Sequence, residues 1–93
     1  MYGVKPSNRY RKSLKRVSQH PSFVAEELDE IVIQLSRNIP LDSRYRDHAL
    51  KGEHRGIREC HIRGDLLLLY QKQDDILILL LVDIGTHTSV FGK

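Results

Sequence analysis

The fold of this chain is decided by residues 56–92, which read GIRECHIRGDLLLLYQKQDDILILLLVDIGTHTSVFG. Residues 56–62 alternate between polar and apolar side chains, which is typical of a strand with two different faces. Residues 66–70 and 76–82 are almost wholly apolar and are expected to be buried strands. Arg63-Gly64-Asp65 forms a tight turn, and residues 71–75 form the next hairpin loop. The stretch therefore predicts three consecutive antiparallel strands, followed by a short C-terminal tail.

Alternation in residues 56–62 separates two sets of side chains. One face carries Ile57, Glu59 and His61, and the other carries Arg58, Cys60 and Ile62. Glu59 and His61 are thus expected on the same face. Cys60 points away from His61, so a paired Cys/His nucleophile is not expected.

The N-terminal half has the pattern of one short strand and two helices. Residues 2–5 are expected to form a strand that stops at Pro6, and Ser7 is expected to cap a helix with a basic outer face. A second helix is expected to start at a Ser22 cap and to end at Asn38 and Pro40. Residues 39–55 are expected to be a long loop without regular structure. The predicted order is β-α-α-β-β-β: a single α+β domain over residues 1–93, with both helices on one face of a largely antiparallel sheet.

Charge is unevenly distributed along the chain. The net charge is +3, and residues 1–20 and 43–64 are basic, whereas residues 21–42 are mostly acidic. Two basic segments favour a nucleic-acid partner, although they also suit solvated helix and loop faces. A single cysteine and the lack of a long apolar run favour a cytoplasmic protein without a membrane segment.

Four residues are expected to meet at one end of the sheet: Glu59, His61, Asp65 and His87. RNA cleavage without a metal needs a base for the 2′-hydroxyl, an acid for the 5′-oxygen and a cation for the phosphorane. Histidines, carboxylates and nearby arginines supply those groups, and Phe91 offers a ring that can stack on a base. Each residue taken alone also suits a structural role. The spacing of the five histidines does not match a metal motif, so neither a metal nor a cofactor is expected.

Four segments together resemble a known family. They are residues 8–16 (NRYRKSLKR), residues 45–52 (YRDHALKG), residues 56–70 with Asp65, and residues 85–92 (GTHTSVFG). In this combination the chain resembles the YafQ-type toxins of the RelE/ParE superfamily, from bacterial type II toxin–antitoxin systems. The resemblance covers essentially the whole chain and implies a RelE-like fold.

This resemblance implies a ribosome-dependent endoribonuclease that cuts mRNA in the decoding site. It implies that His87 is the general acid, that His48, His61 and Asp65 supply the base or hold substrate, and that Phe91 stacks on the base. Glu59 falls where relatives commonly carry an acidic residue. The implied partners are the ribosome, mRNA and a DinJ-like antitoxin with a ribbon-helix-helix domain, whose complex with the toxin is also expected to bind operator DNA.

Two positions depart from the family pattern. Relatives often carry an arginine where this chain has Asp83, and an aromatic residue where it has Leu66. The cation that stabilises the phosphorane is then expected from Arg46, Arg58 or Arg63. Two other functions stay open: a binding module of the same fold that does not cleave, for which Asp83 argues, and gyrase inhibition as in the ParE branch. His87 and the basic face favour RNA cleavage.

Overall fold

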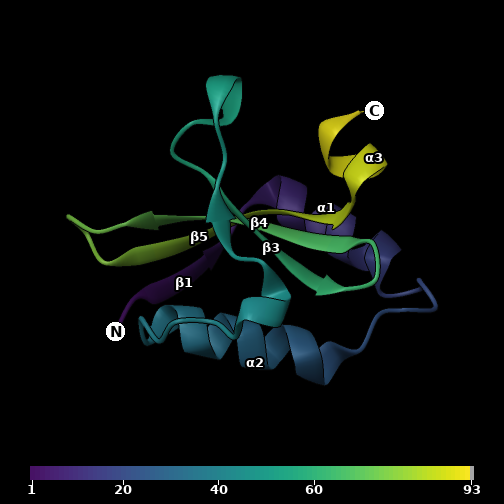
Figure 1. The fold of residues 1–93 in the computed structure, drawn as a ribbon, viewed down its shortest axis with the longest axis horizontal. Coiled ribbons are helices and arrows are strands. Elements are labelled where there is room, and N and C mark those ends of the chain that lie inside the picture. Colours follow the sequence, from purple (N-terminus) through teal and green to yellow (C-terminus); the bar gives the residue numbers. More distant parts are fainter. Residues whose placement is uncertain (93) are drawn as a thin grey trace.

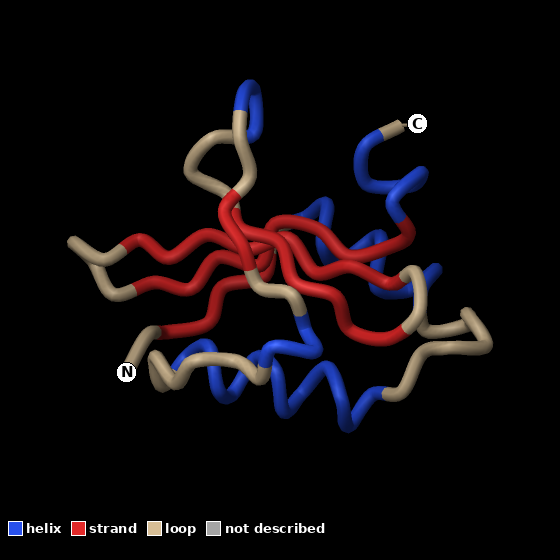
Figure 2. Tube along the Cα trace, viewed as in Figure 1, coloured by secondary structure: helices blue, strands red, loops and turns tan. Residues whose placement is uncertain are grey.

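Strands β3, β4 and β5 follow one another along the chain as antiparallel neighbours in the computed structural model, which describes residues 1–92. The sheet has five strands in the order β1-β5-β4-β3-β2 (Figures 1 and 2). Their bounds are β1 Gly3–Pro6, β2 His48–Ala49, β3 Arg58–Arg63, β4 Leu66–Gln73 and β5 Ile78–Thr86. β1 runs parallel to β5, and the other pairs are antiparallel. The predicted α+β class and the three consecutive strands are confirmed.

The prediction of an irregular loop over residues 39–55 is wrong. This segment holds two short 3₁₀ turns, Ser43–Tyr45 and Gly52–His54, and between them the two-residue strand β2. His48 pairs with Glu59 of β3, and Ala49 pairs with Arg58. The segment is too polar to show a strand pattern, and it is ordered by pairing with the edge of β3.

Helix α1, Asn8–Val17, begins where the sequence predicts. The Tyr10 N–H donates to the Oγ of Ser7 at 3.0 Å, which makes Ser7 its N-cap. Helix α2 spans Ala25–Ser36. Its N-cap residue is Val24, which forms no side-chain cap hydrogen bond. The predicted Ser22 cap is wrong because Ser22 lies in the preceding turn, where its N–H donates to Nδ1 of His20.

Both helices cover one face of the sheet, as expected. The main core contains Tyr10, Val17, Leu28, Ile31 and Leu35 from the helices, and Cys60, Ile62, Leu66, Leu68, Tyr70, Leu79, Leu81 and Ile84 from the strands. On the side away from α2, residues 50–55 and the C-terminal segment rise from the sheet (Figure 1). A smaller core of Leu67, Leu69 and Val90 lies there. Within the described residues, no helix has the length and apolar character needed to cross a membrane.

The last strand differs from the prediction, and the C-terminal tail contains a short helix. Ile76 and Leu77 are 62% and 53% exposed and belong to the β4–β5 turn, where Leu77 adopts a positive φ of 54°. β5 therefore starts later and runs on to Thr86. Within the predicted C-terminal tail, His87–Phe91 forms the short helix α3.

Candidate functional site

Glu59 connects two histidines on the sheet face opposite the helices. Its Oε2 lies 3.2 Å from Nε2 of His48 and 3.5 Å from Nε2 of His61. The backbone produces this arrangement: His48 is the direct partner of Glu59 across β2 and β3, and His61 follows Glu59 by two residues. Glu59 is buried, whereas the two imidazoles are partly exposed. A buried carboxylate thus holds two imidazoles at the surface.

Both ring nitrogens of His48 face hydrogen-bond acceptors. Its Nδ1 lies 2.6 Å from the carbonyl oxygen of Arg46, and its Nε2 faces Glu59. The two contacts hold the ring between the Arg46 carbonyl and the Glu59 carboxylate. Arg46 adopts the left-handed conformation, with φ of 49°, as its carbonyl turns toward this ring.

An open cavity of about 520 Å³ lies beside this cluster. It is lined by His48, Leu50, Lys51, Gly52, Glu53, His54, Glu59, His87 and Phe91. One wall comes from β2 and the Gly52–His54 turn, the floor from β3, and the other wall from α3. The cavity thus unites residues that are up to 43 positions apart, from His48 to Phe91.

Three aromatic rings of the cavity lining contact one another. The Phe91 ring lies 4.8 Å from that of His87 and 5.2 Å from that of His54, in a tilted and an edge-to-face arrangement. Phe91 is half-buried against the smaller core, whereas His87 is exposed. His54 was not among the expected site residues. Only its proximity to Phe91 in the folded chain reveals it, because its local sequence reads as a charged surface turn.

The start of helix α3 is fixed by close contacts among Gly85, Thr86 and Ser89. Thr86 caps it by accepting a hydrogen bond from the Ser89 N–H at 3.2 Å, and the Ser89 hydroxyl donates to the Thr86 carbonyl at 3.0 Å. Gly85 has φ of +157°, and a Cβ there would lie 2.3 Å from Oγ of Ser89. Glycine is favoured because side chains rarely adopt this φ and because a Cβ would force the Ser89 hydroxyl out of its hydrogen bond with the Thr86 carbonyl.

Two of the three arginines expected to replace the missing cation are engaged elsewhere. Arg58 bonds Asp47 and the Tyr70 hydroxyl, and the Tyr70 hydroxyl donates in turn to Asp47. Arg63 forms an ion pair with Glu27 of α2 at 2.8 Å. Both arginines thus have carboxylate partners outside the cavity lining.

Arg46 and Asp65 also lie outside the cavity lining. Arg46 is exposed and contacts the cluster through its backbone carbonyl. Asp65 is exposed in the β3–β4 turn, with Oδ1 3.7 Å from Nε2 of His20. The structure therefore brings together His48, His61, Glu59, His87 and Phe91, but not Asp65 with them. Roles for Arg46 and Asp65 in the reaction stay predictions.

Cys60 is a buried thiol that does not line the cavity. Burial raises the pKa of the Cys60 thiol to about 12, so it stays protonated and unreactive near neutral pH. In the part of the chain that the structure describes, no three His, Cys, Asp or Glu side chains are grouped to hold a metal ion.

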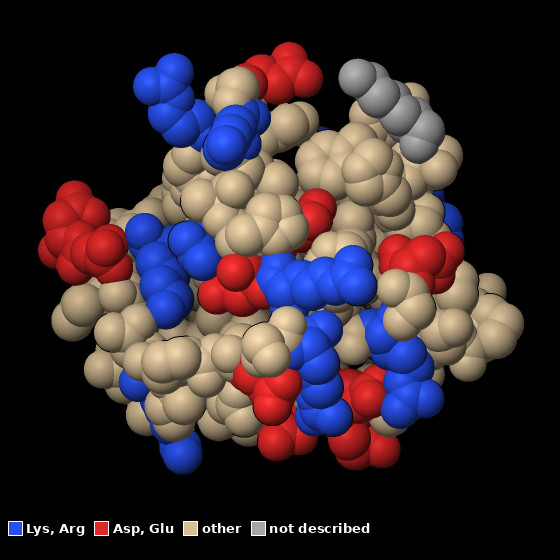
Figure 3. Space-filling view, in the orientation of Figure 1, with Lys and Arg blue, Asp and Glu red and all other residues tan. Residues whose placement is uncertain are grey.

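Basic side chains do not form one continuous patch on the face seen in Figure 3. Lys and Arg there alternate with Asp and Glu. The ion pair of Arg63 with Glu27 is one such contact, joining a basic segment to the acidic α2. On this face, therefore, positive and negative charge are interspersed.

Residues 2–92 match the YafQ family, described as bacterial toxins of type II toxin–antitoxin systems. The chain belongs to the YafQ family. The resemblance seen in the sequence is thereby confirmed across nearly the whole chain.

Solved structures of bacterial toxins, among them YafQ of Escherichia coli, share this fold. A metal-bound toxin from Helicobacter pylori is 36% identical and superposes with a TM-score of 0.90, covering 98% of this chain and all of that one. The Escherichia coli DinJ–YafQ complex contains a chain 27% identical to this one, with a TM-score of 0.86, covering 99% of this chain and all of that one. The expected RelE-like YafQ fold is confirmed.

Curated YafQ proteins also match this chain at the level of sequence. The mRNA interferase toxin YafQ of Escherichia coli K12 is 27% identical over 96% of this chain and 95% of its own length. A YafQ protein of Haemophilus influenzae is 57% identical over 37 residues, which span 40% of this chain and 36% of that protein. An RNA-cleaving relative agrees with the enzyme class that the sequence predicts.

Proposed function

We propose that this YafQ-family toxin is a ribosome-dependent endoribonuclease, which cuts mRNA in the decoding site by acid–base catalysis. One observation carries the proposal: His48, Glu59 and His87 line a single cavity, with His48 and His87 on opposite walls, while His61 lies outside the lining and contacts Glu59. Attack of a 2′-hydroxyl on the adjacent phosphate needs a proton acceptor and a proton donor on the two sides of the phosphorus. The two walls provide groups for both roles.

The base function is assigned to the Glu59 cluster. Glu59 lies within ion-pair distance of both histidines, and it lines the cavity. In the proposal this cluster takes the 2′-hydroxyl proton, while His61 supports Glu59 from the side. A carboxylate shared between imidazoles keeps their rings oriented for proton transfer.

The acid function is assigned to His87. As an imidazolium it would give its proton to the 5′-oxygen as the P–O bond breaks. Phe91 and His54 lie beside it and offer rings on which a base can stack. Lys51, which also lines the cavity, is the cation placed to offset charge on the phosphorane.

The proposed partners follow from the family and from charge. The Escherichia coli relative forms a complex with DinJ. We expect this chain to bind a DinJ-like antitoxin with a ribbon-helix-helix domain, and the pair to bind operator DNA. In the cytoplasm, the free toxin would bind the ribosome and translated mRNA.

Induction in a bacterium tests the function directly. Wild-type toxin, His87→Ala and the control Thr88→Ala would be induced for a short time, with primer extension on a translated message. Thr88 is the exposed neighbour of His87 and is not part of the cavity lining. The proposal expects cuts from wild type and Thr88→Ala that disappear both in His87→Ala and when initiation is blocked.

Other outcomes would point to the alternative functions. Growth arrest with an intact message would favour a binding module, and broken DNA would favour gyrase inhibition. Either result would contradict the ribonuclease proposal.

A further inference from the structure

A buried carboxylate lies on the same sheet face as the proposed site. Asp83 of β5 pairs with Leu69 of β4, which pairs in turn with Glu59 of β3. Residues directly opposite one another on antiparallel strands point to the same face. Asp83 therefore belongs to the site face, although its side chain is only 3% exposed. Its Oδ1 accepts from the N–H of Ile84 at 2.9 Å.

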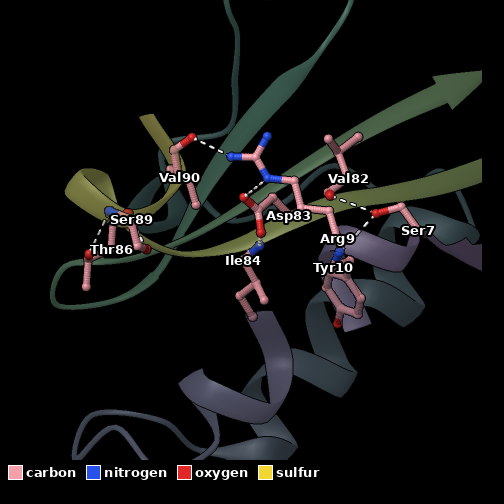
Figure 4. Close-up of polar contacts among 9 residues, drawn as sticks. All are labelled: Ser7, Arg9, Tyr10, Val82, Asp83, Ile84, Thr86, Ser89 and Val90. Atoms are coloured by element: carbon pink, nitrogen blue, oxygen red, sulfur yellow. Dashed lines mark hydrogen bonds and ion pairs between the residues drawn. The ribbon is translucent and has the colours of Figure 1, made fainter. Parts of the chain in front are cut away.

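The charge of Asp83 is balanced by Arg9, near the start of α1. Nε of Arg9 lies 2.8 Å from Oδ2 of Asp83 (Figure 4). The start of α1 is fixed against β5 because the Ser7 N–H donates to the Leu81 carbonyl and the Ser7 hydroxyl to the Val82 carbonyl. These bonds at Ser7 place Arg9, two residues later, beside Asp83 of β5.

The same guanidinium also reaches helix α3. Nη2 of Arg9 donates to the carbonyl oxygen of Val90 at 3.1 Å, as Figure 4 shows. The last carbonyls of a helix lack intrahelical donors, and a cation there also complements the helix dipole. Arg9 therefore joins the buried Asp83 to the C-terminal end of α3.

Helix α3 needs such a contact. It has five residues, too few for a stable isolated helix, and its packing rests mainly on Val90 against Leu67 and Leu69. The helix carries both His87 and Phe91. A small rotation of α3 would move both rings relative to Glu59, and errors of about 1 Å at a reacting group cost as much as about a hundredfold in rate.

We infer that Arg9 is a positioning residue, which clamps α3 to β5 through Asp83 and so holds His87 and Phe91 at the cavity. The catalytic consequence rests on the proposed ribonuclease function. The clamp itself is a property of the free protein. The clamp requires a guanidinium, whose Nε contacts Asp83 while its Nη2 donates to the Val90 carbonyl. A single ammonium group does not reproduce this planar pair of donors.

Variants of Arg9 and Asp83 separate the clamp from other roles. Arg9→Gln removes the positive charge, whereas Arg9→Lys keeps the charge but lacks the planar pair of guanidinium donors. Arg11→Gln is the control, because Arg11 lies on the exposed surface of α1. Arg9→Gln leaves Asp83 buried without its cation, which destabilises the fold. Arg9→Met combined with Asp83→Asn avoids that buried charge and keeps the test interpretable.

The first readout uses the free toxin without RNA. The Gly92 N–H donates to the Thr88 carbonyl within α3, so its hydrogen exchange reports on the helix. We expect exchange at Gly92 to accelerate by about tenfold or more in Arg9→Gln and in the double variant, with weaker NOEs from Val90 to Leu67. Amides of β4 should be unchanged in the double variant. Unchanged Gly92 exchange and NOEs would overturn the clamp.

The second readout is single-turnover cleavage on programmed ribosomes. If Arg9 is a clamp, the maximal cleavage rate should fall by about tenfold or more in Arg9→Gln, in Arg9→Lys and in the double variant. The toxin concentration that gives half of the maximal rate should change little. Arg11→Gln should behave as wild type. If Arg9→Lys keeps full activity while Arg9→Gln only raises half-saturation, Arg9 is a phosphate contact and the inference fails. If wild type does not cleave, the proposed function fails, whereas the exchange result still decides the clamp.

Discussion

Nε2 of His48 lies 3.2 Å from Oε2 of Glu59, and the two residues are direct partners across β2 and β3. A strand of only two residues thus places an imidazole over a buried carboxylate. His61 contacts the same oxygen at 3.5 Å. Glu59 is therefore the residue through which both histidines are held.

Glu59→Gln is expected to lower cleavage by about 10²-fold or more while the protein stays folded. The amide has the same shape, but it lacks the charge that holds both imidazoles and accepts a proton. Single-turnover cleavage and thermal unfolding would be measured together. Glu53→Gln is the matched control, since Glu53 is an exposed acid lining the same cavity. Equal losses in the two variants would refute a specific role for Glu59.

Phe91→Leu is expected to weaken cleavage by about tenfold, because loss of base stacking on an aromatic ring costs on the order of 1–3 kcal/mol. Leucine retains much of the apolar packing, so the melting temperature should fall by only a few degrees. Phe23→Leu is the control: Phe23 is also half-buried but packs against the main core. A large loss of stability without loss of cleavage would make Phe91 a core residue only.

Gly85→Ala is expected to displace α3 and to abolish most cleavage. The new Cβ would meet Oγ of Ser89 at 2.3 Å, at a cost of about 1–3 kcal/mol in stability. Adding Ser89→Ala removes that contact and should restore part of both properties. Gly3→Ala is the control, because its nearest neighbour would lie at an ordinary 3.6 Å. Full activity in Gly85→Ala would show that the start of α3 need not be fixed.

Cys60 should make the protein less stable as the pH rises from 8 to 10. Burial raises the pKa of the folded thiol to about 12 from 9.0, so the thiol of the unfolded chain ionises first, and this ionisation lowers the free energy of the unfolded state. Stability is complete below pH 9 and falls above it, by about 1.4 kcal/mol at pH 10. Urea unfolding at pH 8 and 10 would measure this loss. Cys60→Ala should show a smaller loss, and an identical pH dependence in the two proteins would contradict the argument.

Much of the fold was predictable because its strands and first helix carry strong local patterns. The alternation around Glu59 and His61 placed both on the same face, and Ser7 marked the start of α1. The apolar run from Ile76 did not reveal where β5 begins, since apolarity alone does not distinguish a strand from an exposed hairpin turn.

Features that depend on tertiary contacts were missed. β2 forms because the edge of β3 offers hydrogen bonds to a polar segment. α3 forms because Val90 packs against Leu67 and Leu69. His54 joins the site only through the turn that brings it to Phe91. The position of Asp83 read as a charge reversal in the sequence, whereas in the fold its partner is Arg9, 74 residues away.

The most direct test of the central claim replaces one 2′-hydroxyl. A message with a single 2′-deoxynucleotide 5′ to the cut would be loaded on ribosomes and incubated with toxin. An all-ribose message and one with the deoxy substitution on the 3′ side of the cut are the controls. Acid–base transesterification predicts no cut in the test message, and 5′-hydroxyl ends at the cut site in both controls. Cleavage of the test message at a rate similar to the controls would contradict attack by the 2′-hydroxyl and the roles assigned to Glu59 and His87.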